Sequence, residues 1–557
     1  MSGTVTLIVF LFFQSALSFT HPGLLATTAD LNRAQSKIAL NLDPWLSSWY
    51  SLTNLSYASA DYTPNAVSII YRGDDGEGHA ANNELLWHDA AAAFALTLRW
   101  KISGDDTYAE TASRILTAWG EKLTAIGGND DAYLASGFQG HELANAAELL
   151  RDYAPFSAPG GGLEVFTKMM TSVFLPMNLD FLNHVLGSEH NVKHFFANWE
   201  LGNLASAMAI AVLTDNTTVW DFAVDYFKNG EGNGCINNAV SNLVEEPETG
   251  TVLGQGQEAG RDQGHAALDF QMLGVIGQQA WNQGVDLFGF NDSRILKGAE
   301  YFARYNLNND VPFEPYTNGI VSFTDVSDAS RGALRPTWEL LYSHYIQLKG
   351  LSAPWTTAYL NYSLSTFGGY EPGAGAWGEG SGHYDGLGWG SLLYHLDDSD
   401  VPETYNSTAG LTATVISAAA SSTVTGGASE NVSVSASTTA GLTATVVSAA
   451  ASSTVTGDAS ENVSVPASTT AGLTATVVSA AASSTVMGGA SENVSVPTST
   501  TATLSSGSSS ASATNSVKPS VEAASTLPAT MSLTTATAAK AKHTHHGCHQ
   551  RRRRHHH

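Results

Sequence analysis

Over the first 400 residues, apolar positions recur at helical spacing in consecutive pairs of segments. Residues 81–101 contain an alanine run between Leu85 and Leu98, and Ser-Gly-Asp-Asp at 103–106 ends this helix and caps a second one at 107–123. Further helix pairs are predicted at 161–184 with 194–213 and at 263–282 with 293–306. Short strands are expected only near 65–72 and 319–323. Because β-branched runs do not alternate with these helices, the pattern predicts an all-α fold, layered or closed into an (α/α) toroid.

The pattern changes beyond residue 400. From 403 to 539 the chain consists almost wholly of Ser, Thr, Ala, Val and Gly, with one aromatic residue, Tyr405, and such a composition buries too little apolar surface to offset the entropy of ordering. Gly-Leu-Thr-Ala-Thr-Val begins at Gly410, Gly441 and Gly472, a period of 31, which is also typical of solenoids. Since the large apolar residues that a solenoid stacks are missing, a disordered, mucin-like stalk over 401–539 is favoured.

Both ends of the chain carry segments outside the predicted domain. Residues 1–18 join an apolar run at 7–13 to the small residues Ala16 and Ser18, which is typical of a secretory signal peptide. Residues 540–557 form a basic His- and Arg-rich tail, which fits binding of metal or acidic wall polymers, or a plain solvated tail or tag. Glycosylation sequons in the domain and in the repeats fit an exported glycoprotein. We therefore expect an extracellular protein with one domain over 19–400.

Charge and cysteine content restrict the partners. The chain has 51 acidic and 25 basic residues, a formal net charge of −26, and such a field repels nucleic acid and anionic membranes. No segment after the signal peptide has the length of a membrane span. Of the two cysteines, Cys235 and Cys548, the second lies in the tail, so the domain is expected to fold without an internal disulfide.

We expect a monomer whose stalk associates with the cell wall.

The densest polar cluster runs from Gly254 to His265. Its glycines disfavour a helix, so Glu258 and Arg261 are expected on a loop, and Asp262 is a good N-cap for the helix that follows. His265 then falls in the first turn, where the positive end of the helix dipole favours a neutral imidazole. Such clusters also occur merely as hydrogen bonds that join a loop to a helix, and the residues by themselves leave both interpretations open.

A second candidate is the pair Asn198 and Trp199, at the start of a predicted helix. The amide of Asn198 could hydrogen-bond a sugar carboxylate while the indole stacks on the sugar ring. A buried asparagine beside a tryptophan is also often structural.

The remaining candidates are aromatic residues and a histidine near the end of the domain. Tyr305 lies at the end of the predicted helix 293–306, and Tyr316 follows two prolines that hold the backbone extended and place it on a loop. His383 and Tyr384 lie in the glycine-rich stretch 368–390, which allows close approach of a ligand.

Several short motifs together resemble a known family. They are His21-Pro-Gly-Leu-Leu25, Trp100-Lys-Ile-Ser-Gly-Asp105, Ala146-Ala-Glu-Leu-Leu-Arg151, Asn198-Trp199, Glu258 to His265, Tyr305-Asn-Leu and Val311-Pro312. The chain carrying them is similar to the alginate lyase domain family, which comprises polysaccharide lyases such as alginate and glucuronan lyases. The match covers most of residues 21–395, and Gly-Arg-Asp-Gln-Gly-His is its most specific element.

The resemblance implies an (α/α) toroid with a cleft or tunnel, and β-elimination of a uronic-acid polymer without a cofactor or a required metal. It implies that Asn198 neutralises the substrate carboxylate, that His265 is the active-site histidine and that Glu258 is an accompanying acid. Tyr316 is then the expected catalytic tyrosine, with Tyr305 as the alternative. The expected substrate-binding residues are Trp199, Arg261, Tyr305, His383 and Tyr384.

The chemistry of a uronate explains why such residues are needed. Loss of the C5 proton builds a dianion, so hydrogen-bond donors such as Asn198 and His265 must stabilise the carboxylate before a base can act. Tyrosine or histidine can serve as the base at C5 and as the acid at the leaving O4. Arg261 either orients the carboxylate or pairs with Glu258.

Two other classes of protein are weighed against the lyase. An inverting glycoside hydrolase on a helical toroid would use two carboxylates, for which Asp89 and Glu258 are candidates. A wall-binding protein without activity is the other, because a fold does not guarantee a function.

Overall fold

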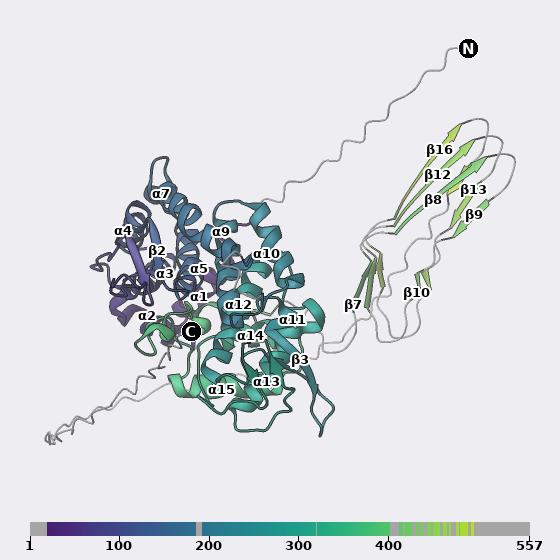
Figure 1. Ribbon diagram of the computed structural model, residues 1–557. Helices are drawn as coiled ribbons and strands as arrows, with labels where there is room; N and C mark the ends of the chain where they lie inside the picture. The colour runs from purple at the N-terminus through teal and green to yellow at the C-terminus, as the bar shows by residue number, and fades with distance from the viewer. Residues whose placement is uncertain are drawn as a thin grey trace, which may run out of the picture. The chain divides into compact units, whose positions relative to one another are not determined.

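The computed structural model describes residues 19–184, 192–318 and 320–401, together with strands between 412 and 494 (Figure 1). The chain divides into two compact units, of which the first holds Met1–Thr412 and Gly441–Thr443 and the second holds Ala413–Ala440 and Ala444–His557. The predicted signal peptide and the basic tail, with Cys548, lie outside the described residues.

Helices make up most of the first unit, which confirms the predicted all-α fold (Figure 1). All the predicted helical segments are present, and the one at 161–184 contains a π-helical turn, Met170–Phe174. Among the described helices, none is both long and apolar enough to cross a membrane. The α-helices are α1 (Thr28–Ala39), α2 (Trp45–Asn54), α3 (Glu84–Ser103), α4 (Asp106–Lys122), α5 (Ala132–Leu150), α6 (Ala154–Ser157), α7 (Gly162–Met169), α8 (Leu175–Leu182), α9 (Ala197–Leu213), α10 (Thr217–Asn229), α11 (Ile236–Ala239), α12 (Gln263–Asn282), α13 (Phe290–Asn306), α14 (Trp338–Tyr342), α15 (Pro354–Phe367) and α16 (Gly390–Leu393).

Burial separates these helices into two groups. α5, α9, α12 and the middle of α3 are buried around their whole circumference, whereas α4 and α10 bury one face only. A helix that is apolar on all sides belongs in the interior, and an amphipathic helix covers it. Helix α5 packs along α9 and α3, α9 along α12 and α10, and α3 along α4. The hairpins therefore form the inner and outer layers of the toroid.

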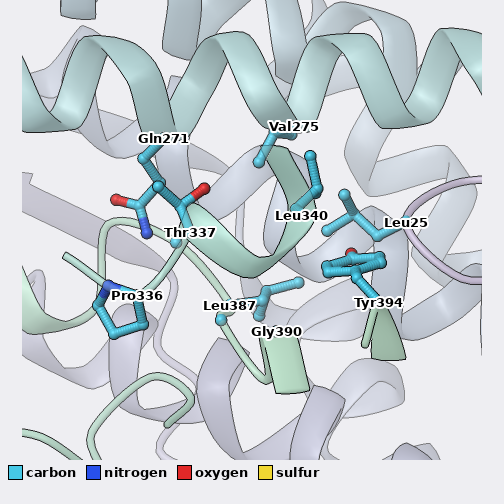
Figure 2. A pocket seen from close by; sticks show the side chains of 11 residues that line it. Leu25, Gln271, Val275, Pro336, Thr337, Leu340, Leu387, Gly390 and Tyr394 are labelled. Atoms are coloured by element: carbon cyan, nitrogen blue, oxygen red, sulfur yellow. The ribbon is translucent and has the colours of Figure 1, made fainter. Parts of the chain in front are cut away.

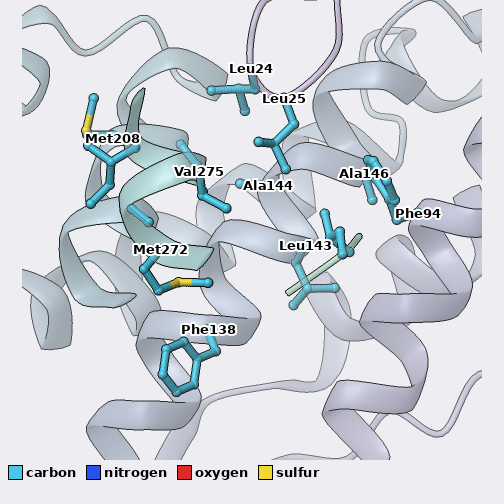
Figure 3. Close-up of a cluster of buried hydrophobic side chains, with 14 of the residues drawn as sticks. Leu24, Leu25, Phe94, Phe138, Leu143, Ala144, Ala146, Met208, Met272 and Val275 are labelled. Carbon is cyan, nitrogen blue, oxygen red and sulfur yellow. The ribbon is translucent and has the colours of Figure 1, made fainter. Parts of the chain in front are cut away.

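Large side chains from all four inner helices share one core (Figure 3). Phe94 comes from α3, Phe138 from α5, Met208 from α9 and Met272 from α12, and each is at most 1% exposed. A Cβ atom at position 202 would lie 2.7 Å from the ring of Phe138, so α5 and α9 approach this closely because Gly202 has none. Burial of each such side chain contributes about 1.5–3 kcal/mol, and Phe138→Ala would remove about 3–5 kcal/mol.

Short two-stranded sheets accompany the helices. They are β1 (Ile69–Arg72) parallel to β2 (Ala125–Gly128), β3 (Val240–Glu245) antiparallel to β4 (Val252–Gly256), and β5 (Tyr316–Thr317) antiparallel to β6 (Ser322–Phe323). Strands β1 and β6 fall where strands were predicted, and the hairpin β3–β4 was not predicted. This hairpin matters for function, because β4 leads directly into the loop before α12.

Strands of the second unit follow the 31-residue repeat. β8 (Ala418–Thr425) pairs in parallel with β12 (Ala449–Thr456), and β12 pairs with β16 (Ala480–Met487), so that equivalent residues of successive repeats are partners. The same register relates β9 (Glu430–Ser433) to β13 (Glu461–Ser464) and β13 to β17 (Glu492–Val494), β10 (Ala436–Ser437) to β14 (Ala467–Ser468), and β11 (Thr443–Val446) to β15 (Ala475–Val477). Strand β7 (Thr412–Val415) pairs with β11. The rest of the predicted stalk lies outside the described residues.

Candidate active site

The loop between β4 and α12 caps the start of α9. Helix α9 begins at Ala197, and its own flanking side chain, Phe196, provides no cap. Oε1 of Gln257 accepts the backbone N–H of Ala197 at 2.9 Å. Oε1 of Glu258 accepts the backbone N–H of Asn198 at 3.0 Å. Because the first N–H groups of a helix have no partner within it, two adjacent loop residues supply what the sequence around α9 lacks.

Glu258 is fully buried and joins two of the predicted site residues. Its Oε1 also accepts a hydrogen bond from Nδ2 of Asn198 at 2.5 Å, and its Oε2 accepts one from Nη1 of Arg261 at 2.6 Å. Of the two roles left open for Arg261, the structure therefore has the pairing with Glu258. The carboxylate also fixes the amide of Asn198 with its nitrogen toward the loop, and that nitrogen carries a second proton for another acceptor.

Asp262 caps α12 as predicted and orients His265. It accepts the backbone N–H of His265 at 2.9 Å, and its Oδ2 lies 2.6 Å from Nδ1 of the imidazole. Nη2 of Arg261 lies 3.2 Å from Nε2 of the same ring. A guanidinium only donates, so Nε2 is the acceptor and Nδ1 carries the proton, as in a neutral imidazole. Burial acts to raise the pKa of Asp262, but the hydrogen bonds from His265 outweigh it and lower that pKa to about 2.

A buried acid that the sequence analysis missed lies one turn further along α12. Asp269 is 1% exposed. Burial, and next the charge of Glu258, raise the pKa of Asp269 well above its ordinary value. Burial thus favours the protonated form of Asp269, while Arg261 pairs with Glu258. The signal for it was that Asp269 is the one acidic residue of the segment 263–282, one turn after His265.

Tyr316 reaches the same loop from β5. Its hydroxyl accepts a hydrogen bond from Nε2 of Gln257 at 2.9 Å. Burial raises the pKa of Tyr316, so the phenol is neutral at physiological pH. Because Gln257 also binds the start of α9, Tyr316 lies beside the segment that carries Asn198.

Trp199 and Tyr305 lie outside this hydrogen-bonded cluster. The indole of Trp199 packs against Phe195 and Phe181, with ring centroids 4.9 and 6.2 Å away. Tyr305 is buried in α13, and its ring lies 3.8 Å from the guanidinium carbon of Arg331.

His383 and Tyr384 belong to a neighbouring aromatic cluster. Tyr384 is 2% exposed, its hydroxyl lies 2.8 Å from that of Tyr57, and its ring stacks on Trp87. The ring of His383 packs against Trp377. Arg335 connects the two clusters, because its guanidinium donates to the carbonyl oxygens of Gly264 at 3.3 Å and Gly382 at 2.8 Å, each next to a predicted site residue.

Asp89, the second carboxylate considered for a hydrolase, is engaged in hydrogen bonds within the fold. Its carboxylate accepts hydrogen bonds from the hydroxyl of Tyr62, from the backbone and side-chain nitrogens of Asn65, and from Nε1 of Trp119. Four donors fill the acceptor sites of a carboxylate, so Asp89 anchors the loop before α3 to α4. This geometry disfavours the hydrolase mechanism.

A cavity and a cluster of metal-ligating side chains lie elsewhere in the first unit. The cavity among Leu25, Gln271, Leu340 and Tyr394 has a volume of about 20 Å³ (Figure 2), which suits one water molecule and excludes a sugar. Among the described residues, one group of carboxylates and imidazoles is close enough to share a metal ion, on the exposed loop 75–79. It includes none of the predicted site residues.

The fold and the site together define a class of protein. It is a helical toroid in which buried acids, a guanidinium, an oriented imidazole and a phenol lie near the start of α9. Residues 47–313 match the sequence model of the family described as Alginate lyase. Residues 47–313 are thus similar to the alginate lyase family, and the chain is a polysaccharide lyase.

Solved structures of similar proteins are also alginate lyases. Alginate lyase A1-III from Sphingomonas species A1 is 13% identical, with a TM-score of 0.41, and the match covers 68% of this chain and 100% of that one. A tetrasaccharide complex of an A1-III variant gives 13% identity, a TM-score of 0.43 and coverage of 67% and 96%. An alginate lyase from Bacteroides ovatus gives 14% identity, a TM-score of 0.37 and coverage of 51% and 83%. No protein of curated function matches the chain in sequence.

Proposed function

We propose that this protein is a secreted lyase that cleaves a uronic-acid polysaccharide, of the alginate or glucuronan type, by β-elimination. The observation that carries the proposal is the hydrogen-bonded cluster in which Glu258 holds Asn198 and Arg261, and Arg261 in turn contacts His265. It offers donors to a carboxylate and proton-transfer groups in one place.

Asn198 is the residue proposed to bind the substrate carboxylate. One proton of its amide nitrogen goes to Glu258, and the second is left for a uronate oxygen. Asn198 is also the second residue of α9, where the positive end of the helix dipole favours a negative ligand. Both effects stabilise the dianion that forms when the C5 proton is lost.

His265 and Tyr316 are proposed to move the protons. One takes the proton from C5 and the other protonates O4 of the leaving sugar. A neutral imidazole suits the base and a neutral phenol suits the acid, whereas the reverse assignment needs a phenolate as base and an imidazolium as acid. The C5–H bond and the C4–O4 bond break while a double bond forms between C4 and C5, so one product carries an unsaturated uronide at its non-reducing end. The other keeps O4 as the hydroxyl on its anomeric carbon, which is a new reducing end.

The aromatic residues around this cluster are proposed to bind neighbouring sugars of the chain. Trp199, Tyr305, His383 and Tyr384 are the candidates for such contacts, and Tyr305 is the alternative catalytic tyrosine. No step is assigned to a metal or a cofactor.

A screen of uronans across pH tests the proposal. Incubation with alginate, glucuronan and other uronans should give unsaturated products that absorb ultraviolet light. Cleavage to wholly saturated products that do not absorb ultraviolet light would instead identify a hydrolase, and tight binding without depolymerisation would identify a wall-binding protein.

Secretion, glycosylation and association of the stalk with a cell wall complete the proposal, and the domain is proposed to act as a monomer. The apolar segment at the start of the chain and the sequons support export. Edman sequencing of the secreted protein should find an N-terminus near residue 19. Retention of residues 1–18 would contradict the signal peptide.

A further inference from the structure

Gln257 lies between the start of α9 and Tyr316 and contacts both. Its side chain is 1% exposed. Oε1 accepts the backbone N–H of Ala197, and Nε2 donates to the hydroxyl of Tyr316, each over 2.9 Å. The next residue, Glu258, holds Asn198. Two adjacent loop residues therefore connect the proposed carboxylate-binding residue to the proposed tyrosine.

The orientation of the Gln257 amide is fixed by the backbone. The N–H of Ala197 only donates, so the amide atom that faces it is the oxygen. The amide nitrogen then faces Tyr316, and the phenol oxygen must be the acceptor. Consequently the proton of the phenol points away from Gln257.

We infer that Gln257 is a positioning residue for the elimination, which fixes the hydroxyl of Tyr316 and stabilises the phenolate that Tyr316 carries during proton transfer. The inference rests on the proposed role of Tyr316. If the phenol protonates O4, its O–H bond breaks and the electron pair stays on the phenol oxygen. If the phenolate takes the C5 proton, the same oxygen is charged beforehand. In both cases the N–H of Gln257 donates to a negatively charged oxygen.

The surroundings of Tyr316 make this hydrogen bond important. Burial raises the pKa of the phenol, and the charges of Glu258 and Glu200 raise it further. The hydrogen bonds from Gln257 and Asn233 act in the opposite direction. Loss of the Gln257 donor should therefore make the phenolate harder to form.

Two substitutions of Gln257 and a matched control test the inference. Gln257→Met removes both hydrogen bonds, whereas Gln257→Glu keeps an acceptor for the N–H of Ala197 and so keeps the cap of α9. Gln279→Met is the control, because Gln279 is also fully buried and bonds Asn145 and the carbonyl of Ala205. We expect both Gln257 variants to lower kcat about tenfold or more with KM within about twofold, and Gln279→Met to change neither.

Titration of Tyr316 provides a measurement that does not depend on activity. In full-length protein with ¹³C-labelled tyrosine, the signal of Tyr316 is assigned by its absence in Tyr316→Phe. We expect its pKa to rise in both Gln257 variants and to stay unchanged in Gln279→Met. In the Tyr316→Phe background, Gln257→Met should lower kcat no further.

The outcomes separate the inference from the proposed function. If the pKa of Tyr316 is unchanged in folded Gln257 variants, the inference is overturned. It is also overturned if Gln257→Met lowers kcat in the Tyr316→Phe background as much as it does when Tyr316 is present. Full activity of Tyr316→Phe would overturn the proposed role of Tyr316, whereas a raised pKa in the Gln257 variants would still support the fixed hydroxyl.

Discussion

His265 is the side chain whose chemistry the proposed mechanism uses most directly. Its side chain is 42% exposed, although Asp262 and Arg261 engage its two nitrogens. We expect His265→Ala to lower kcat about a hundredfold or more, the usual contribution of a positioned proton-transfer group. The melting temperature should change little, because a half-exposed ring packs little. Steady-state kinetics and thermal unfolding of the same preparation measure both quantities.

The opposite pattern would identify a structural histidine. If His265→Ala lowers the melting temperature and leaves activity per molecule near normal, the ring merely joins the loop to α12. The cluster around Glu258 would then not be the active centre.

Asn198 acts on the same developing charge in the proposed mechanism. We expect Asn198→Ala to lower kcat on a similar scale, and the double variant with His265→Ala to lose much less than the product of the single effects. Because Asn198 is 2% exposed and bonds Glu258, its replacement should also lower thermal stability. Fully multiplicative losses in kcat would show that the two residues act independently.

At the scale of elements, the segment before α1 ties the ends of inner helices together. Nδ1 of His21 lies 2.5 Å from Oε1 of Glu148 at the end of α5, and Nε2 lies 3.1 Å from Oδ1 of Asp215 just after α9. The backbone N–H of Leu25 donates to Oδ1 of Asn145 at 2.9 Å. These bonds make the first described residues part of the toroid.

This connection should depend on pH. The hydrogen bond to Glu148 raises the pKa of His21 above its ordinary value of 6.5. A raised pKa in the folded state means that the stabilisation is complete below pH 6.5 and is lost as pH rises through the folded-state value. We expect His21→Gln to lower the free energy of unfolding more at about pH 5.5 than at about pH 8.5, as measured by denaturant titration. If His21→Gln lowers the free energy of unfolding equally at both pH values, the ion pair between His21 and Glu148 is contradicted.

At the scale of the whole molecule, the net charge of −26 opposes a polyanionic substrate. Salt screens this repulsion, since the Debye length is about 8 Å at 0.15 M ionic strength. We expect KM for a cleaved uronan to fall as ionic strength rises from about 0.01 to 0.15 M, with kcat unchanged. Initial rates of product absorbance measure both. A KM that rises with salt would mean that a local basic path controls binding.

Much of the fold and part of the site followed from sequence. The start of the helix at Gln263 was predicted correctly, because glycines exclude a helix before Asp262 and an aspartate caps the one after it. The loop position of Glu258 and the first-turn position of His265 follow from the same local rules. Local chemistry therefore determined the helices, their pairing along the chain and the placement of this cluster.

Only the tertiary structure decided how these residues contact one another. The cap of α9 comes from Gln257 and Glu258, which are 60 positions away in sequence, and Asn233 reaches Tyr316 from another loop. The raised pKa of Asp269 arises because α12 buries it beside Glu258. Such contacts and charge states depend on distances across the fold, and the spacing and composition of the sequence do not encode these distances. The start of a helix depends on a few neighbouring residues, and the spacing and composition of the sequence do encode it.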